Sequence, residues 1–283
     1  MQLDKKTITL FQEEILAWYA ANKRNLPWRE THDPYKILVS EIMLQQTQVS
    51  RVIPKYEAWL EKFPTIESLA IAKKEDILRL WSGLGYNRRA LYLQKCAVAL
   101  QKLKTENIKL KTDDSPTYWP QTIEELEELP GIGPYTARAI ACFAFHQQVA
   151  VVDTNVRKVI LVKFSEDSGQ ARMTNKELQE IADELLPIGQ AYDWNQALMD
   201  YSNIVLQKEK VVTKKQSTFK NSDRYYRGKL LRVLLVQKSL PVSEIGYVLR
   251  DDYSQKDEAW KTKLLEGLEK DGLLQIKESE VSI

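Results

Sequence analysis

The sequence predicts an all-α fold, and three observations support this prediction. Apolar residues recur at helical spacing through most of the chain. Two turns, at residues 83–86 and 129–133, each carry two glycines one residue apart, and each separates segments with a helical pattern. Strand-like sequence is confined to the C-terminal end, where residues 272–276 and 280–283 are expected to pair as a small β-hairpin.

The helices of the first half follow from the apolar spacing. The first helix is marked by the apolar positions Ile8, Phe11, Ile15, Trp18 and Tyr19. Residues 25–29 and the Asp33-Pro34 pair interrupt the pattern. Further helices are expected, in order, at residues 35–44, 47–63 with an interruption near Pro54, 65–72, 74–83 and 87–103.

The second half continues the helical pattern after a polar, irregular stretch at residues 110–120. Helices are expected at residues 123–129, 135–145, from 153 onward, 175–186 and 194–207. Residues 208–221 lose the apolar pattern and are expected to form a linker or loop. Helices at residues 223–236, 243–249 and 257–271 then precede the hairpin. This order is typical of a winged helix, so residues 222–283 are predicted to form a winged-helix-like module.

Composition excludes a membrane span and a secretory leader. The 283 residues contain no apolar run of membrane-spanning length, and the N-terminal pattern is that of an amphipathic helix, so we expect a cytoplasmic location. The two cysteines, Cys96 and Cys142, lie within helical patterns and are expected to be buried thiols. The net charge of +2 does not by itself indicate a nucleic-acid partner, but residues 207–238 carry ten Lys or Arg against two acids.

Residues 129–158 combine a turn that can bind an anion with a carboxylate. The glycines of the turn permit a sharp backbone reversal, and Pro134 suits the first turn of the helix that follows. Backbone N–H groups at such a helix start can bind phosphate. About twenty residues later, Asp153 begins another helix. Asp is also a preferred N-cap, so a purely capping role for Asp153 stays open at this point.

The turn LPGIGPYTA (129–137) and the downstream VDTN (152–155) resemble the helix–hairpin–helix DNA glycosylase superfamily, which includes endonuclease III and MutY. Three further motifs resemble its MutY-type, adenine-specific members: LPWR (26–29), SEIMLQQTQV (40–49) and WSGLGY (81–86). The resemblance spans about residues 7–206. It implies a two-lobed glycosylase domain at 1–221, with lobes at 28–128 and at 1–27 plus 129–221.

The resemblance also implies a chemistry that uses two carboxyl groups. Adenine leaves readily only when protonated, and Glu41 lies between apolar residues that would raise its pKa, as a general acid requires. Asp153 matches the family residue that stabilises the sugar cation or adds to it. Tyr135 stands where bifunctional relatives carry a Schiff-base lysine, so the enzyme is expected to be monofunctional. In relatives with this tyrosine its hydroxyl bonds the catalytic Asp; simple helix packing with the hydroxyl at the surface stays open.

The remaining site residues expected from the resemblance bind the base and the DNA. The base pocket is expected to be lined by Trp28, Arg29 and Gln196. Gln46 and Tyr86 are expected to push into the base stack, with Thr47 beside them at the DNA, although Tyr86 could instead be a turn aromatic that covers the core. Backbone groups of Gly131, Ile132 and Gly133 would contact a phosphate, with a monovalent cation possible at this turn. The expected partner is double-stranded DNA with a mispaired or damaged base pair, bound by a monomer.

Three departures from the family are visible. Where relatives hold a [4Fe–4S] cluster on four cysteines, this chain has Leu206, Thr213, Gln216 and Ser222, so no cluster is expected. The basic loop 208–220, with Lys214 and Lys215, is expected to keep a role at the DNA backbone, unless it is only a solvated charge run. Thr154 replaces a family glycine and Lys158 a family arginine, and a Nudix-like reader of 8-oxoguanine is replaced by the C-terminal module.

The function expected from these motifs is base-excision removal of adenine mispaired with 8-oxoguanine or guanine, by hydrolysis of the N-glycosidic bond without strand cleavage. Two alternatives remain. One is a mismatch thymine or uracil glycosylase of the same superfamily. The other is a non-catalytic DNA-binding protein on this scaffold, against which the presence of both Glu41 and Asp153 argues.

Overall fold

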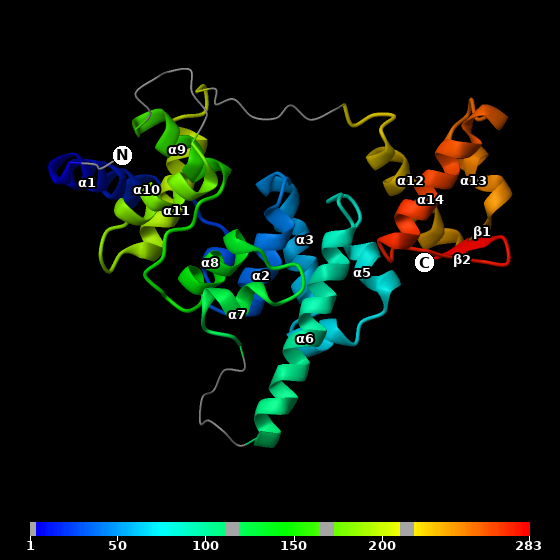
Figure 1. Ribbon diagram of the computed structural model, residues 1–283, viewed down its shortest axis with the longest axis horizontal. Helices are drawn as coiled ribbons and strands as arrows, with labels where there is room; N and C mark the ends of the chain where they lie inside the picture. Colours follow the sequence, from blue (N-terminus) through cyan, green and yellow to red (C-terminus); the bar gives the residue numbers. More distant parts are fainter. Residues whose placement is uncertain (1–3, 111–118, 165–172, 210–217) are drawn as a thin grey trace. The chain divides into compact units, whose positions relative to one another are not determined.

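The computed structural model describes residues 4–110, 119–164, 173–209 and 218–283, which are mainly helical (Figure 1). Contacts divide the chain into two compact units: Met1–Glu41, Pro120–Glu128 and Ile132–Lys215 form the first, and Ile42–Trp119, Leu129–Gly131 and Gln216–Ile283 the second. This division differs from the expected lobes and keeps the C-terminal module with the second unit; the domain boundaries given above stay predictions. None of the described helices is long and apolar enough to cross a membrane.

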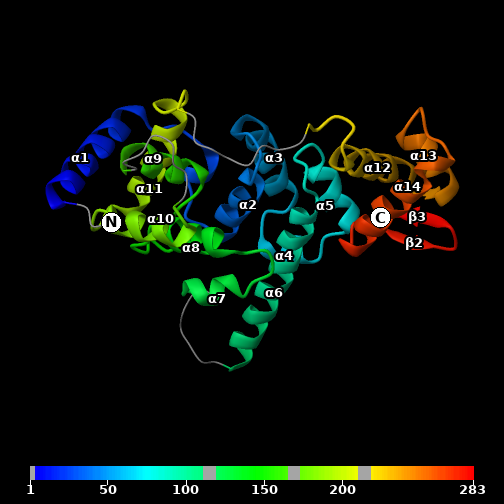
Figure 2. The same cartoon turned by 45° about the horizontal axis from the view of Figure 1, so that its top comes forward.

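The first unit contains the helices on either side of the glycine turn. Its elements (Figure 2) are α1 (Lys5–Asn22), the 3-10 helix η1 (Pro27–Arg29), most of α2 (Pro34–Leu44), α7 (Ile123–Glu127), α8 (Pro134–Phe143), α9 (Thr154–Phe164), α10 (Asn175–Glu184) and α11 (Ala191–Ile204). The expected helix at 194–207 begins earlier and ends earlier in the structure.

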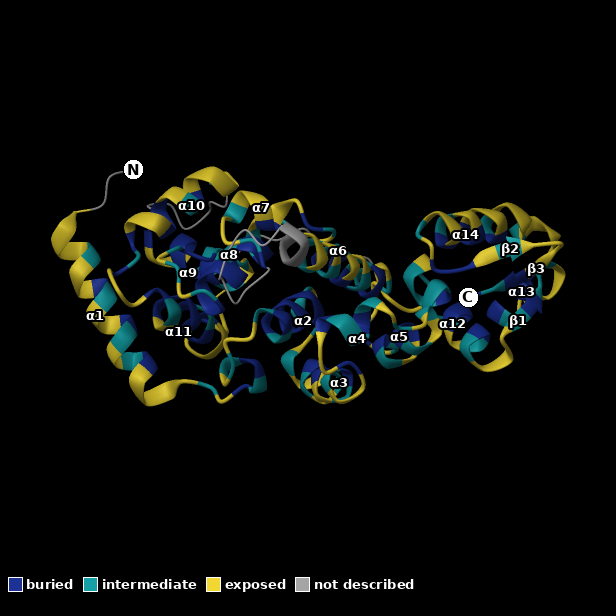
Figure 3. Ribbon diagram, turned by 90° about the horizontal axis from the view of Figure 1, so that it is seen from below, coloured by how far each residue is buried: buried dark blue, intermediate teal, exposed yellow. Residues whose placement is uncertain are grey.

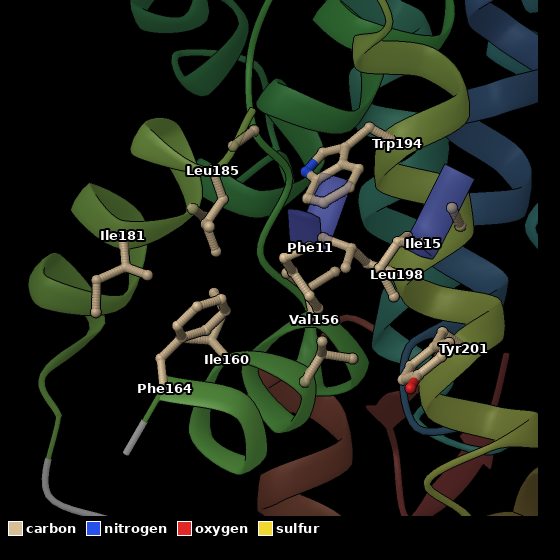
Figure 4. Close-up of a cluster of buried hydrophobic side chains, with 14 of the residues drawn as sticks. Phe11, Ile15, Val156, Ile160, Phe164, Ile181, Leu185, Trp194, Leu198 and Tyr201 are labelled. Atoms are coloured by element: carbon tan, nitrogen blue, oxygen red, sulfur yellow. The ribbon is translucent and has the colours of Figure 1, made fainter. Parts of the chain in front are cut away.

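The core of the first unit is organised around α11, which contacts both α1 and α9. Trp194 is fully buried, and the ring of Phe11 meets it edge to face at 5.7 Å and meets Phe164 in the same way at 5.0 Å (Figure 4). Edge-to-face aromatic pairs stabilise a core beyond the area that they bury. The apolar spacing read from the sequence therefore identifies the buried face of α1, while its outer face is exposed (Figure 3).

The second unit begins with α3 (Val49–Lys62), α4 (Ile66–Ala70), α5 (Lys74–Trp81) and α6 (Arg88–Leu110). The expected interruption near Pro54 is wrong, because α3 runs through this residue. Pro54 is exposed, whereas Trp59, five residues further along the helix, is fully buried and packs on Trp81 with ring centroids 5.6 Å apart. Packing of the buried face compensates for the single helical hydrogen bond that the proline removes.

The C-terminal part of the second unit has the order of a winged helix, as predicted. Its elements are α12 (Asp223–Gln237), β1 (Ser239–Pro241), α13 (Val242–Leu249), η2 (Gln255–Asp257), α14 (Glu258–Lys270), β2 (Gln275–Lys277) and β3 (Glu280–Ser282). The sheet is antiparallel in the order β1-β3-β2, with Leu240 opposite Val281 and Ile276 opposite the same residue. The three-residue strand β1 was missed, because so short a strand has no measurable alternation.

This module shares a hydrophobic core with the glycosylase helices of its unit. Leu78 of α5 and Leu91 of α6 belong to the same buried cluster as Leu230, Leu234 and Leu268 of the module. Since α12 also contacts α5 directly, the module is packed against these helices.

Two helical glycines of the module should respond oppositely to the same substitution. A Cβ at Gly246 would lie 2.2 Å from Cζ of Tyr253, a buried ring whose hydroxyl donates to Glu258 at 2.6 Å. Gly246→Ala should therefore destabilise by about 1–3 kcal/mol, as overpacking does. A Cβ at Gly228 meets only an arginine tip at 3.7 Å, so Gly228→Ala should stabilise by about 0.5–1 kcal/mol. Urea unfolding measures both; equal effects would show that Tyr253 is not packed on Gly246.

Candidate active site

A buried carboxyl group, that of Glu41, is the centre of the candidate site. Glu41 lies on α2 with 6% of its surface exposed. The hydroxyl of Tyr135, on α8, donates a hydrogen bond to Glu41 Oε2 at 2.6 Å. Burial raises the pKa of Glu41 from 4.5 to about 7, although the Tyr135 bond lowers it; the charge of Asp153 raises it further and that of Arg29 lowers it. The carboxyl group is therefore partly protonated near neutral pH.

Tyr135 bonds a different carboxyl group from the one expected. The hydroxyl was expected to bond Asp153. This prediction is wrong, because the hydroxyl donates its hydrogen bond to Glu41. A phenol has one proton to donate. Burial, followed by the nearby charges of Glu41 and Asp153, raises the pKa of Tyr135 well above 10, so the phenol keeps that proton. A hydroxyl at the surface is also excluded.

Asp153 is both an N-cap and a member of the site. Its Oδ1 accepts from the backbone N–H groups of Asn155 at 2.8 Å and Val156 at 2.7 Å, and its Oδ2 accepts from Asn155 Nδ2 at 2.6 Å. Burial nevertheless raises the pKa of Asp153. Capping fixes the carboxylate, and the electrostatic effect on Glu41 shows that the two carboxyl groups interact. Thr154, in place of the family glycine, is the first residue of α9.

Asn195, which the sequence analysis missed, positions the segment before Asp153. Its side chain is buried; Oδ1 accepts from Val151 N–H at 2.8 Å, and Nδ2 donates to the carbonyl of Val149 at 3.0 Å. This extended segment thereby obtains the hydrogen bonds that its buried backbone needs. The available signal was an amide beside the apolar residues Trp194, Ala197 and Leu198 of α11.

Arg29, expected in the base pocket, is held by a buried carboxylate. Asp200 is fully buried and binds both Arg29 nitrogens, at 2.8 and 2.9 Å, as well as Arg24 Nε at 2.6 Å. Burial raises the pKa of Asp200, but the hydrogen bonds from Arg29 and Arg24 lower it more, so it falls below the ordinary value. The guanidinium of Arg29 is therefore already paired with Asp200, while its positive charge lowers the pKa of Glu41.

Gln196 and Trp28, the other expected pocket residues, are both buried, on α11 and η1. The Oε1 atom of Gln196 is buried and has no hydrogen-bond partner within the described part of the chain. Its side chain also bonds Tyr192, whose hydroxyl donates to the carbonyl of Arg29 at 3.0 Å. Tyr192 was missed, and it links two of the expected residues.

In the second unit, the residues expected to enter the base stack lie on two turns that share one arginine. Gln46, Thr47 and Tyr86 lie on the turns 45–47 and 83–86, named here the glutamine turn and the tyrosine turn. Arg89 Nη1 donates to the carbonyl of Gln45 at 2.6 Å, and Nη2 donates to Thr47 Oγ1 at 3.3 Å and to the Gly85 carbonyl at 3.1 Å. Arg89, missed in the sequence analysis, thus joins the turns.

Both turns place a non-glycine residue in the left-handed region. Gln46 has φ of 55° and Tyr86 φ of 48°. Such backbone is uncommon outside glycine and is costly unless surrounding contacts impose it. Tyr86 is 41% exposed, so covering the core is not its main role. The Arg89 guanidinium lies 5.6 Å from its ring centroid and contributes to holding it.

The glycine turn has the backbone that its sequence requires. Gly131 has φ of 84°, and a Cβ there would lie 2.7 Å from Cβ of Tyr92, so only glycine fits. Ile132 is buried, and Gly133 is the N-cap of α8, with Pro134 in the first turn. A phosphate or cation at these residues stays a prediction.

The four positions that would carry cluster cysteines do not fit a cluster. Leu206 is buried in the first core, and Lys158 donates to its carbonyl. Ser222 caps α12. Thr213 and Gln216, like Lys214 and Lys215 of the basic loop, lie outside the described residues. The chain has only two cysteines, on α6 and α8, and burial raises the pKa of both thiols to about 12.

Known proteins show what this chain resembles. Residues 39–184 match the family model of the HhH-GPD superfamily base excision DNA repair proteins. An adenine DNA glycosylase of Mycolicibacterium smegmatis is 36% identical over 279 residues, which cover 90% of this chain and 91% of that protein. The solved structure of a thermostable thymine-DNA glycosylase has a TM-score of 0.59 and 30% identity, covering 70% of this chain and 87% of that one.

A trapped endonuclease III–DNA covalent intermediate has the same fold, with a TM-score of 0.56 and 19% identity over 71% of this chain and 86% of that one. The family match, the similarity to the bacterial adenine DNA glycosylase over nine-tenths of the chain, and the motifs around Glu41 and Asp153 all indicate the same family. The chain therefore belongs to the HhH-GPD superfamily of base excision DNA repair proteins, and within it to the MutY-type adenine DNA glycosylases.

Proposed function

We propose that this adenine DNA glycosylase hydrolyses the N-glycosidic bond of adenine mispaired with 8-oxoguanine or guanine in double-stranded DNA, as a monomer and without cutting the strand. One observation carries the proposal. Glu41 is buried, has a pKa of about 7, is held by Tyr135 and interacts with the charge of Asp153. A proton donor and a carboxylate at one place are what cleavage of a glycosidic bond requires.

The reaction uses these groups in sequence. Protonated Glu41 gives its proton to a ring nitrogen of adenine, and the bond from the sugar C1′ to the base nitrogen breaks, its electrons leaving with neutral adenine. The Asp153 carboxylate stabilises the cation left on the sugar or adds to it. Water then supplies the oxygen at C1′ and gives a proton to the Glu41 carboxylate, which restores the acid. Tyr135 has no amine to form an imine, so the product is an intact strand with an abasic site.

Recognition of adenine is assigned to the buried amide of Gln196. A buried acceptor without a partner costs free energy, and a bound donor removes that cost. Its Oε1 is such an acceptor among the described residues, and the exocyclic amine of adenine is a matching donor. The motif SEIMLQQTQV (40–49), typical of the adenine-specific members, argues against the thymine or uracil alternative, although one structure of 30% identity bears a thymine-DNA glycosylase name.

We also propose that the enzyme works without an iron–sulfur cluster. Without a cluster, the chain after α11 is held by the hydrophobic packing of Leu206 and by the hydrogen bond that Lys158 donates to the Leu206 carbonyl. Ser222 caps the start of α12. The basic residues Lys214 and Lys215 would contact the DNA backbone, where cationic side chains contribute salt-dependent affinity. The cytoplasmic location expected from the sequence stays a prediction.

The first experiment is single-turnover base excision on duplexes that pair A with 8-oxoguanine, A with G, T with G and A with T. Adenine should be lost from the first two only, and the strand should stay intact until alkali is added. Asp153→Asn and Glu41→Gln should each lower the rate by about 10²–10⁴-fold, as loss of an essential acid or charge does. Glu57→Gln, an exposed carboxyl group on α3, is the control. Thymine loss, or tight binding without base loss, would refute the proposal.

The pH dependence of excision tests the role of Glu41. Since the acid must be protonated, the rate should fall by about tenfold per pH unit above about pH 7. The Tyr135 hydroxyl stabilises the charged carboxylate and so lowers the pKa of Glu41. Tyr135→Phe removes that bond, raises the pKa, and should move the alkaline fall to higher pH. The exposed Tyr247→Phe should leave the profile unchanged. A shift to lower pH would contradict this assignment.

The cluster proposal has a direct test. Protein purified under anaerobic conditions, from cells supplied with iron, should be colourless, without the visible absorbance of an iron–sulfur cluster, and should excise adenine fully. Stoichiometric iron bound to a brown protein would overturn the proposal.

A further inference from the structure

The C-terminal module contacts the tyrosine turn through one arginine. Arg224, in the first turn of α12, donates from Nη1 to the hydroxyl of Tyr86 at 2.9 Å. Its guanidinium carbon lies 6.0 Å from the centroid of the same ring. Tyr86 and Arg224 are 138 positions apart in sequence, so this contact exists only because the module folds onto the tyrosine turn. All of these residues belong to the second unit.

Further bonds anchor the module close to this turn. Asp271, at the end of α14, accepts from Arg227 of α12 and pairs with Arg88 at 3.3 Å. Arg88 begins α6, two residues after Tyr86. Arg79 of α5 donates to the carbonyl of Leu235 at 3.1 Å. Together with the shared leucine core, these contacts hold the N-terminal turn of α12 against the tyrosine turn.

The charge balance of the module argues against the idea that its third helix, α14, binds in the DNA major groove. Residues 222–283 contain eleven Lys or Arg and eleven Asp or Glu, so the module has no net charge. Of the three lysines of α14, Lys261 is buried and donates to Glu258 at 3.0 Å, and the exposed Lys263 and Lys270 share the helix with three glutamates. A helix that enters the major groove normally carries an excess of cationic side chains. The balanced charge of α14 therefore favours a role for the module other than that of a basic reading helix.

Tyr86 needs support because its backbone is strained and its ring is exposed. The φ of 48° costs free energy, and 41% of the residue faces solvent. Arg89 bonds the backbone of the tyrosine turn, and its guanidinium lies 5.6 Å from the centroid of the Tyr86 ring. Arg224 supplies a hydrogen bond at the far end of the ring, the hydroxyl. Arg89 thus contacts the ring itself, and Arg224 bonds its hydroxyl.

We propose that Arg224 is a positioning residue that holds the Tyr86 ring in the conformation that enters the base stack, and that the C-terminal module thereby controls how easily adenine is extruded. The inference rests on the proposed function. It gives the module a role in base-pair recognition that needs no groove contact of its own. Preorganising an inserted side chain lowers the ordering cost of binding.

The test combines Arg224→Met, Tyr86→Phe and the double variant in single-turnover excision from the 8-oxoguanine:A duplex, with enzyme in excess. Each single change should slow excision by about tenfold, the effect of losing one charge-assisted hydrogen bond. The double variant should be no slower than either single variant, because both remove the same bond. Arg224→Lys should recover part of the rate. Arg232→Met, at an exposed position further along α12, should match the wild type.

A second readout separates positioning from general damage and from failure of the proposed function. A 2-aminopurine beside the mispair brightens when the stack opens, whether or not the base is removed. On protein binding, the brightening should be smaller in Arg224→Met and normal in Arg232→Met, with urea midpoints unchanged in both. Equal brightening, or multiplied rate losses in the double variant, would overturn the inference. Absence of excision by the wild type would refute the proposed function alone, because the fluorescence comparison still decides the role of Arg224.

Discussion

The chemistry proposed for this protein depends on one physical constraint, the removal of the Glu41 carboxyl group from water. A carboxyl group that cannot be hydrated holds its proton to higher pH, and here burial raises the pKa to about 7. The Tyr135 hydroxyl opposes this shift, because its hydrogen bond stabilises the carboxylate that remains once the proton has been transferred. Burial and one hydrogen bond thus set both the availability of the proton and its release.

The surrounding polar groups make this buried site possible because nearly all of them have partners. Asp200, with no exposure of its own, pairs with two arginines, and Asn195 completes the hydrogen bonds of the segment that leads to Asp153. Asp153 receives three hydrogen bonds from the start of α9. The cap and the proposed catalytic group are therefore one residue, since the helix start that needs an acceptor also holds the carboxylate in place.

In the second unit, side-chain contacts stabilise two turns whose backbone is strained. Gln46 and Tyr86 occupy the left-handed region on two turns, and the guanidinium of Arg89 bonds both turns at once. Arg224 adds a bond from a part of the chain that lies beyond the family's motifs. A rigid, exposed tyrosine is suited to enter a base stack, because the ordering cost is met before DNA binds. The winged-helix topology thus supports the turn beside which it is packed.

The sequence by itself determined the helical class, the turn glycines and the winged-helix order, and its motifs marked Glu41, Asp153 and Tyr135 as candidate site residues, because these depend on local spacing, backbone geometry and motif. It could not determine which carboxyl group Tyr135 bonds, that Asp200 occupies the fork of Arg29, or that Arg89 and Arg224 meet at Tyr86. Each of these is a contact between residues distant in the chain. Only tertiary packing decides such contacts, since it alone sets which buried polar groups must satisfy one another.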